Sequence, residues 1–311
     1  MMAGKRIVLP GGSGFLGRNL RDRLAARGDS VVVLTRGAPG SGPGWESVLW
    51  DPATLAEWVS VLDGADAIVH LSGKRVDCRP TIRNLAELIS SRVVPVRTLG
   101  RAWSQVPKPP PVWVQLSSLA RYGDAGETLI DEDTVPFADG PPQMVQVCTE
   151  WEAAFASFSQ QVPRSVVLRA GIGLGGSGDP ATERLMWLAR MGLGGKVASG
   201  RQWVSWVSME DFMAVLIRAI DDDTMVGLYH VTSPNPIPNL EMMATYRRLV
   251  GRRFGLPSPE WVTHIGAWLL GSDPALALTG RRAVPTRLLE EGYDFAIPDF
   301  EDAAALAVAA T

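Results

Sequence analysis

The chain has 311 residues, and 30 Lys and Arg against 33 Asp and Glu residues give it a formal net charge of −3. This length exceeds the size at which one hydrophobic core usually stops growing, so we expect one large domain or two unequal ones. The interspersed charges argue against a nucleic-acid-binding face, and no apolar run is long enough to span a membrane. The cysteines, Cys78 and Cys148, form neither a disulfide framework nor a metal-binding pair, so we expect a cytoplasmic protein without a metal.

An apolar stretch near the start runs directly into a glycine-rich turn. Residues 7–17 read I-V-L-P-G-G-S-G-F-L-G, and a helical pattern follows over Phe15–Ala26. Such glycines allow a tight turn and bring the backbone close to a pyrophosphate, which then faces the positive N-terminus of the helix. This context predicts a dinucleotide site, whereas the alternative is a strand-to-helix turn without a ligand. The residues expected at the cofactor here are Gly11, Gly12, Ser13, Gly14, Phe15, Leu16 and Gly17.

Strand and helix patterns then alternate over most of the chain. This alternation predicts an α/β fold with a Rossmann-type, doubly wound parallel sheet. Pro95 is expected to kink or interrupt the longest helix. The strand-like runs are Ser30–Thr35, Val48–Trp50, Ala67–Leu71, Val112–Ser117, Ser165–Ala170 and Leu228–Thr232. The helical patterns lie near Pro52–Leu62, Thr81–Ser104, Met144–Gln160 and Met209–Asp221.

The end of the second strand indicates which dinucleotide fits. An NAD site usually places an acid there for the ribose 2′-hydroxyl, whereas a 2′-phosphate needs a cation. Here the strand ends in Thr35-Arg36 without an acid, so we expect NADP(H) in preference to NAD(H), with Arg18 as a second contact. Asp51, after the next strand, either accepts from the adenine amino group or caps a helix before Pro52.

The alternation of strand and helix patterns becomes irregular after the predicted strand Ser165–Ala170. Glycine-rich loops at 171–178 and 192–195 are followed, from Pro234 onward, by prolines, isolated tryptophans and short helices. We interpret this part as a smaller C-terminal substrate lobe over the carboxyl edge of the sheet, where ligands bind in such folds. Arg201 and Trp203 are candidates to hold an anionic or planar substrate, although a buried Trp-rich strand is an equal alternative for Trp203. Trp206 is expected in the core.

Several motifs, taken in order, give the chain a family resemblance. G-G-S-G-F-L-G (11–17), T-R (35–36), W-D (50–51), H-L-S-G (70–73), S-S-x-x-x-Y-G (117–123) and V-L-R-A-G (167–171) resemble an extended short-chain dehydrogenase/reductase. Four further segments are similar to its nucleoside-diphosphate-sugar epimerase-like subgroup, which carries a characteristic C-terminal domain. These are C-x-x-W-E (148–152), G-R-Q-W-V-S-W-V (200–207), S-P-N-P (233–236) and V-P-x-x-L-L-E-x-G-Y-x-F (284–295).

This resemblance implies a Rossmann domain from residues 1–172 plus 205–235 and a substrate lobe from 173–204 plus 236–311. It also implies a nicotinamide cofactor and a small-molecule substrate. Many relatives pair through two long helices, here around 84–103 and 144–160, so a homodimer is expected. Further cofactor contacts are expected from Leu71, Ser72, Gly73, Gly171 and Ile172.

The resemblance also implies a catalytic Ser, Tyr and Lys, and here the chain departs from the family pattern. The Lys lowers the pKa of the Tyr so that the phenol exchanges a proton with the substrate oxygen, which the Ser polarises. Ser118 has the spacing of the family's Ser, and Ser117 is the alternative. Counted back from Glu152, the Tyr and Lys positions fall on Met144 and Cys148, which cannot perform these roles.

Three interpretations therefore stay open, since none of the four tyrosines has Lys four residues later. The first is an NADP(H)-dependent, epimerase-like oxidoreductase with a rebuilt proton relay. Tyr122 is then the acid, Ser117 or Ser118 lies beside it, and Cys148 or Lys74 helps from a distance. In the second, the hydride acceptor is activated by its own electronics. In the third, the protein binds the dinucleotide without turnover, as a sensor or interaction protein.

Overall fold

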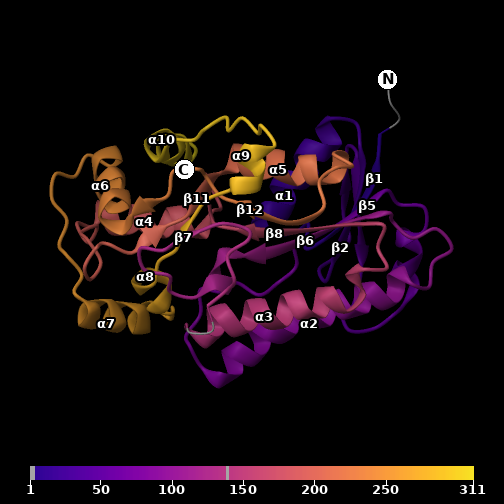
Figure 1. The fold of residues 1–311 in the computed structure, drawn as a ribbon, viewed down its shortest axis with the longest axis horizontal. Helices are drawn as coiled ribbons and strands as arrows, with labels where there is room; N and C mark the ends of the chain where they lie inside the picture. The colour runs from indigo at the N-terminus through magenta and orange to yellow at the C-terminus, as the bar shows by residue number, and fades with distance from the viewer. Residues whose placement is uncertain (1–3, 138–139) are drawn as a thin grey trace.

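A large sheet lies at the centre of the computed structural model, which describes residues 4–137 and 140–311 (Figure 1). All neighbouring strands are parallel except the pair β3 and β4. The predicted doubly wound parallel sheet is therefore confirmed. In order across the sheet, the strands are β12 (Gly227–Val231), β8 (Arg164–Ala170), β6 (Val112–Ser118), β5 (Ala67–His70), β1 (Arg6–Pro10), β2 (Ser30–Thr35), β4 (Trp45–Leu49) and β3 (Ser41–Gly42).

The strand order reverses between β1 and β5. From β1 the chain first adds β2 and β4 on one side, then returns to β5 and adds β6, β8 and β12 on the other. The carboxyl ends of β1 and β5, at Pro10 and His70, meet at the point of reversal. In open α/β sheets the ligand crevice forms at such a switch point.

Each face of the sheet carries its own apolar core. Ile7 and Leu9 belong to one core and Val8 to the other, because successive side chains of a strand point to opposite faces. Figure 1 shows helices covering both faces. The first core is closed by α1 (Phe15–Ala26), α5 (Met209–Asp221) and α9 (Thr286–Glu290), and the second by the 3₁₀ helix η1 (Glu57–Leu62), α2 (Ile82–Trp103) and α3 (Pro142–Ser159).

A third apolar cluster lies beyond the carboxyl edge of the sheet. Its centre is Trp206, fully buried as predicted, whose ring meets that of Phe300 edge to face at 5.2 Å. Three small sheets in this region pair β9 with β11, β10 with β13 and β7 with β14. The helices and strands not yet given bounds are η2 (Leu119–Tyr122), β7 (Leu129–Ile130), β9 (Ile172–Leu174), α4 (Pro180–Arg190), β10 (Trp203–Val204), β11 (Trp206–Ser208), β13 (Ile237–Pro238), α6 (Asn239–Leu249), α7 (Glu260–Leu270), α8 (Ala275–Leu278), β14 (Arg282–Ala283) and α10 (Phe300–Ala309).

Two of the predicted helices differ from those observed. The helix expected over Pro52–Leu62 starts only at Glu57, as a 3₁₀ helix, because Asp51 holds the preceding residues in a turn. Pro95 does not interrupt α2, which runs unbroken from Ile82 to Trp103. A proline inside a helix costs about 3 kcal/mol. The buried side chains around it, packed on the sheet, outweigh that cost.

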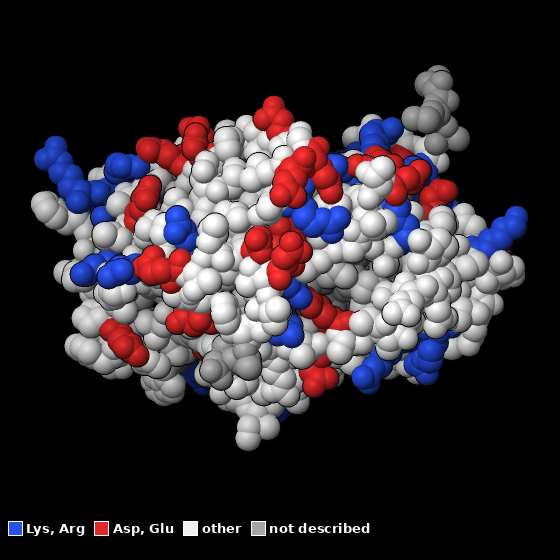
Figure 2. All heavy atoms as spheres, in the orientation of Figure 1, with Lys and Arg blue, Asp and Glu red and all other residues white. Residues whose placement is uncertain are grey.

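The surface carries both signs of charge. Figure 2 shows acidic and basic side chains interspersed over the face in view, in keeping with the composition. Across the described residues, none of the helices is long and apolar enough to cross a membrane.

Candidate cofactor and substrate site

The glycine-rich turn connects β1 to α1 and is packed too tightly for side chains. Gly11 has a φ of 87°, and a Cβ there would lie 2.6 Å from the backbone nitrogen of Ser72. A Cβ at Gly17 would lie 2.4 Å from the carbonyl oxygen of Gly11, and one at Gly12 would lie 2.9 Å from the Val33 side chain. These contacts press the helix against the strand, as a pyrophosphate cradle requires.

The N-terminus of α1 lies beside this turn without a protein cap. Gly14 is the N-cap residue, and neither a side-chain cap nor a first-turn acid occurs there among the described residues. Ser13 is exposed, and Phe15 and Leu16 are half-buried. The guanidinium of Arg18 donates to the Ser13 carbonyl at 2.8 Å and so ties the helix to the turn. Free N–H groups and the helix dipole together suit an anion.

The residues after β2 place a cation at the same edge of the sheet. Thr35 is buried, and its hydroxyl accepts from the backbone N–H of Gly37 at 3.2 Å. Arg36 follows and is exposed. Both carboxylate oxygens of Asp51 are engaged locally, by the Ala53 N–H at 3.0 Å and the Thr54 hydroxyl at 2.8 Å. These bonds lower the pKa of Asp51, and they favour its turn-capping interpretation.

The segment after β5 lies against the turn. The Leu71 N–H donates to the Pro10 carbonyl at 2.9 Å, and the Ser72 hydroxyl lies 2.5 Å from Nε2 of His70. Gly73 is exposed, and a Cβ there would come within 3.0 Å of the Arg92 guanidinium. The fold thus brings these residues together with the glycine turn at the switch point.

The last expected cofactor residues follow β8. The Gly171 N–H donates to the Val231 carbonyl at 3.0 Å, and the Ile172 N–H to the Ser205 carbonyl at 2.9 Å. A Cβ at Gly171 would lie 2.6 Å from that Ser205 oxygen, while the Ile172 side chain is exposed. All the predicted cofactor residues therefore lie at carboxyl ends of parallel strands.

The two candidate serines at the end of β6 differ in their surroundings. Ser117 is buried, and its hydroxyl donates to Oε1 of Glu152 at 2.6 Å. Ser118 is half-buried, and its oxygen accepts from the Ala120 N–H at 3.2 Å. Among residues 4–137 and 140–311 the Ser118 hydroxyl proton has no acceptor, whereas that of Ser117 is used internally.

Tyr122 belongs to an internal hydrogen-bonded chain. The Nδ1 atom of His230 lies 3.0 Å from the Val284 carbonyl, which can only accept, so this nitrogen carries the proton. The other ring nitrogen of His230 then accepts from the Tyr122 hydroxyl at 2.8 Å. The same hydroxyl oxygen accepts from Nη1 of Arg169 at 2.7 Å.

This hydrogen-bonded network does not favour Tyr122 as the acid that transfers a proton to the substrate. Its side chain is fully buried, and burial raises its pKa. Its proton is directed to two internal acceptors, His230 and the Asp131 carbonyl at 3.1 Å, and burial lowers the pKa of His230 to about 4. Neither distant helper fits better. Burial raises the pKa of Cys148 to about 12, and the Lys74 ammonium is paired with Glu87 at 2.5 Å. The role of Tyr122 as the acid stays a prediction.

Arg201 and Trp203 contact the same carboxylate, that of Glu127. The Arg201 guanidinium is exposed and lies 3.1 Å from Glu127, which also accepts from the Trp203 indole N–H at 2.7 Å. Both members of this ion pair are largely exposed, so it contributes little, and substrate binding by Arg201 stays a prediction. The half-buried Trp203 ring lies under the Arg282 guanidinium at 4.4 Å.

Sequence reasoning missed Arg281, which faces the position where the family pattern expects a Tyr. Its Nη2 atom donates to the Met144 sulfur and to the Thr279 hydroxyl, both at 3.0 Å. Cys148 lies one turn after Met144 on α3. No motif points to Arg281, because its importance depends on α3, more than a hundred residues earlier in the chain.

The model of the family described as "NAD dependent epimerase/dehydratase family" matches residues 7–230. The chain belongs to this family. A second model, described as a domain of unknown function (DUF1731), matches residues 258–306. The predicted family resemblance, including a characteristic C-terminal domain, is therefore confirmed.

The bovine epimerase family protein SDR39U1 is 32% identical over 300 residues, which cover 94% of this chain and 96% of that protein. Among solved structures, human SDR39U1 (isoform 2) with NADPH has a TM-score of 0.85 and 29% identity, over 98% of this chain and 100% of that one. MoeE5 in complex with UDP-glucuronic acid and NAD has a TM-score of 0.78 over 97% of each chain, but its 18% identity shows the fold alone.

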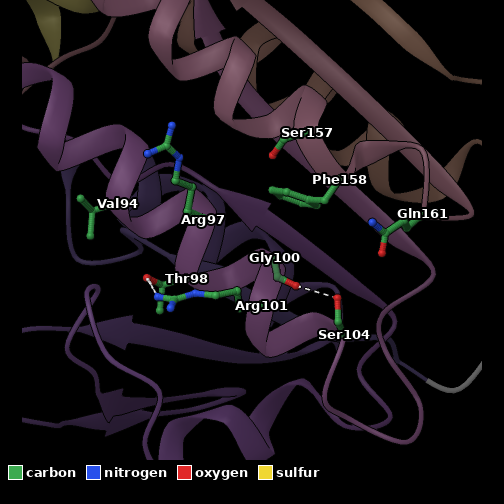
Figure 3. A pocket seen from close by; sticks show the side chains of 9 residues that line it. All are labelled: Val94, Arg97, Thr98, Gly100, Arg101, Ser104, Ser157, Phe158 and Gln161. Atoms are coloured by element: carbon green, nitrogen blue, oxygen red, sulfur yellow. Dashed lines mark hydrogen bonds between the residues drawn. The ribbon is translucent and has the colours of Figure 1, made fainter.

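A surface groove between α2 and α3 does not belong to this family site. Figure 3 shows it beside Arg97, Arg101, Phe158 and Gln161, toward the C-terminal ends of both helices. Because these helices run antiparallel to the strands, the groove lies toward the amino edge of the sheet, away from the glycine turn. Nor does any group of three His, Cys, Asp or Glu side chains in residues 4–137 and 140–311 come close enough to hold a metal ion.

Proposed function

We propose that this chain is an NADP(H)-dependent oxidoreductase of the extended short-chain dehydrogenase type. The observation that carries the proposal is the uncapped N-terminus of α1 behind a glycine turn that tolerates no side chains, at the switch point of the sheet. The human SDR39U1 structure with NADPH supports it, since that protein resembles this chain over its whole length.

In this proposal the turn 11–17 binds the pyrophosphate, and Arg36 binds the 2′-phosphate with its planar guanidinium. Thr35 and Asp51 lie near the adenosine. Residues 71–73, Gly171 and Ile172 line the part of the site that would hold the nicotinamide ring (the nicotinamide side). The Rossmann domain is formed by 1–172 plus 205–235 and the substrate lobe by 173–204 plus 236–311. A homodimer through α2 and α3 and a cytoplasmic location stay predictions.

The cofactor, when bound, supplies or accepts a hydride. Ser118 is the residue that we place at the substrate oxygen, because among the described residues its proton has no acceptor and it ends the strand beside the nicotinamide side. No phenol and ammonium pair is available, since Met144 and Cys148 occupy those positions. The proton that the reduced oxygen takes up must therefore come from water, and the substrate must be one whose carbonyl accepts a hydride without prior protonation.

The lack of the family's Tyr and Lys at positions 144 and 148 supports a second candidate, a protein that binds NADP(H) without turnover. Oxidation of NADPH in the presence of a panel of activated carbonyl compounds separates the two. We expect slow oxidation by the wild type. Removing a hydrogen-bond donor from a developing oxyanion costs about 100-fold or more in rate, so S118A should lose about that factor.

Y122F serves as the matched variant in this assay. We expect it to keep the turnover of the wild type while losing stability, because His230, Arg169 and the Asp131 carbonyl all lose their hydrogen bond to the Tyr122 hydroxyl. A wild type that binds NADPH but never oxidises it would favour the binding protein. Loss of turnover in Y122F with S118A unaffected would support Tyr122 as the acid.

A further inference from the structure

Arg281 is a half-buried cation whose Nε atom is buried and has no hydrogen-bond partner in the described structure. Its Nη2 atom donates to the Met144 sulfur, a weak acceptor, and to one hydroxyl, that of Thr279. Leaving a buried guanidinium nitrogen without an acceptor is unfavourable, and native structures rarely keep such a group without a reason.

Other buried arginines are satisfied by oxygen atoms. Arg164 donates to the carbonyls of Ala219 at 2.7 Å, Ile220 at 2.8 Å and Met225 at 3.3 Å. Arg169 forms a bidentate pair with Glu152, at 2.9 and 2.7 Å. Arg281 differs from both in its acceptors, and in the described part of the chain it shares an unpartnered Nε with the neighbouring Arg282.

The acids near Arg281 are engaged by other groups. Glu152, Arg92, Arg121 and Arg281 all act on the thiol of Cys148, one turn after Met144. The Glu152 carboxylate, however, is bound by two nitrogens of Arg169. Asp124 is the acid that acts on Arg281, but its Oδ1 accepts from the backbone N–H of Gly280 at 3.0 Å. Among the described residues, neither of these carboxylates forms a hydrogen bond or ion pair with Arg281 itself.

We propose that Arg281 binds a carboxylate of the substrate, so that this chain acts on a carboxylate-bearing compound. This inference rests on the proposed function, because it places the substrate at the Met144 position beside the nicotinamide side. A single guanidinium matches one negative charge, and its planar fork suits a carboxylate. The Thr279 hydroxyl adds no donor, because it donates to the Ala275 carbonyl at 2.8 Å. The flexible Met144 side chain can move aside, and its sulfur then gives way to oxygen.

The test uses acetate as the probe, because any carboxylate subsite admits so small an anion. Thermal unfolding of the full chain is followed in sodium acetate, with sodium chloride at equal ionic strength and acetamide as the neutral analogue. We expect 100 mM acetate to raise the Tm of the wild type by about 2–4 °C relative to both controls, the shift that linkage gives for millimolar binding.

R281M should lose this acetate-specific shift and, in chloride, should unfold no earlier than the wild type, because it removes a buried guanidinium nitrogen that has no acceptor in the described structure. R164M is the matched control. It should unfold earlier, since it abandons three carbonyl oxygens, yet keep the acetate shift. An equal acetate shift in R281M, or none specific to acetate in the wild type, would overturn the proposal.

NADPH binding is measured on the same samples by energy transfer from the tryptophans. R281M should bind NADPH as the wild type does. If the wild type fails to bind NADPH, the proposed function fails, while the acetate shift still reports on Arg281 in the protein alone. The two failures are therefore distinguishable.

Discussion

Replacing Glu152 by Gln is expected to lower the free energy of unfolding by about 3 kcal/mol, the lower end of the range for breaking a buried ion pair. Glu152 accepts from two nitrogens of Arg169 and from the Ser117 hydroxyl at 2.6 Å. Both members of the pair are largely shielded, with side-chain exposures of 9% for Arg169 and 19% for Glu152. The neutral amide leaves the guanidinium uncompensated, and Arg169 in turn holds Tyr122.

The measurement is urea unfolding of the wild type and of E152Q, with E150Q as the control on the same helix. Glu150 is exposed, so its replacement should change stability by less than about 0.5 kcal/mol. If E152Q unfolds at the same urea concentration as E150Q, the ion pair does not anchor the network around Tyr122. Glu152 would then be available for a role in proton transfer.

Replacing Gly17 by Ala is expected to weaken NADPH binding by about 100-fold or to prevent it, because the added methyl group has no room. It would lie 2.4 Å from both the Gly11 carbonyl oxygen and the Gly12 Cα. Overpacking of this kind typically costs about 1–3 kcal/mol and shifts the backbone. Here the shift would move α1, whose N–H groups form the proposed phosphate site.

Gly14→Ala provides the comparison within the same turn. Its Cβ would meet only the Gly11 carbonyl oxygen, at 3.3 Å, and its φ of −73° is accessible to alanine. We expect NADPH binding in this variant to remain within about tenfold of the wild type. Equal binding by G17A and the wild type would mean that the turn is architecture without a ligand.

The central sheet could be predicted because its strands are short, apolar and β-branched. Ser30–Thr35 was located to the residue, as were the helices Phe15–Ala26 and Met209–Asp221. Local pattern and tertiary burial agree in these elements. At Pro95 they conflict, and the packing of α2 on the sheet prevails.

The small sheets beyond the carboxyl edge could not be predicted. Strand β14 pairs Arg282–Ala283 with Leu129–Ile130, and neither two-residue segment has a period to recognise. In the candidate site, too, local features could be predicted and contacts between residues far apart in the sequence could not. The glycine turn is local and was found, whereas the ion pair of Arg201 involves Glu127, 74 residues away. The contact of Arg281 with Met144 spans 137 residues.

The most direct test of NADP(H) binding is a titration of the full chain with NADPH and with NADH, followed by energy transfer from its tryptophans to the reduced nicotinamide. A charge-assisted hydrogen bond contributes about 1.5–3 kcal/mol, so Arg36→Ala should weaken NADPH binding by about 10- to 100-fold and leave NADH binding unchanged. The control is R83A, which alters an exposed arginine elsewhere, on α2. It should bind both nucleotides as the wild type does. Failure of the wild type to bind either nucleotide, or undiminished NADPH binding by R36A, would contradict the account.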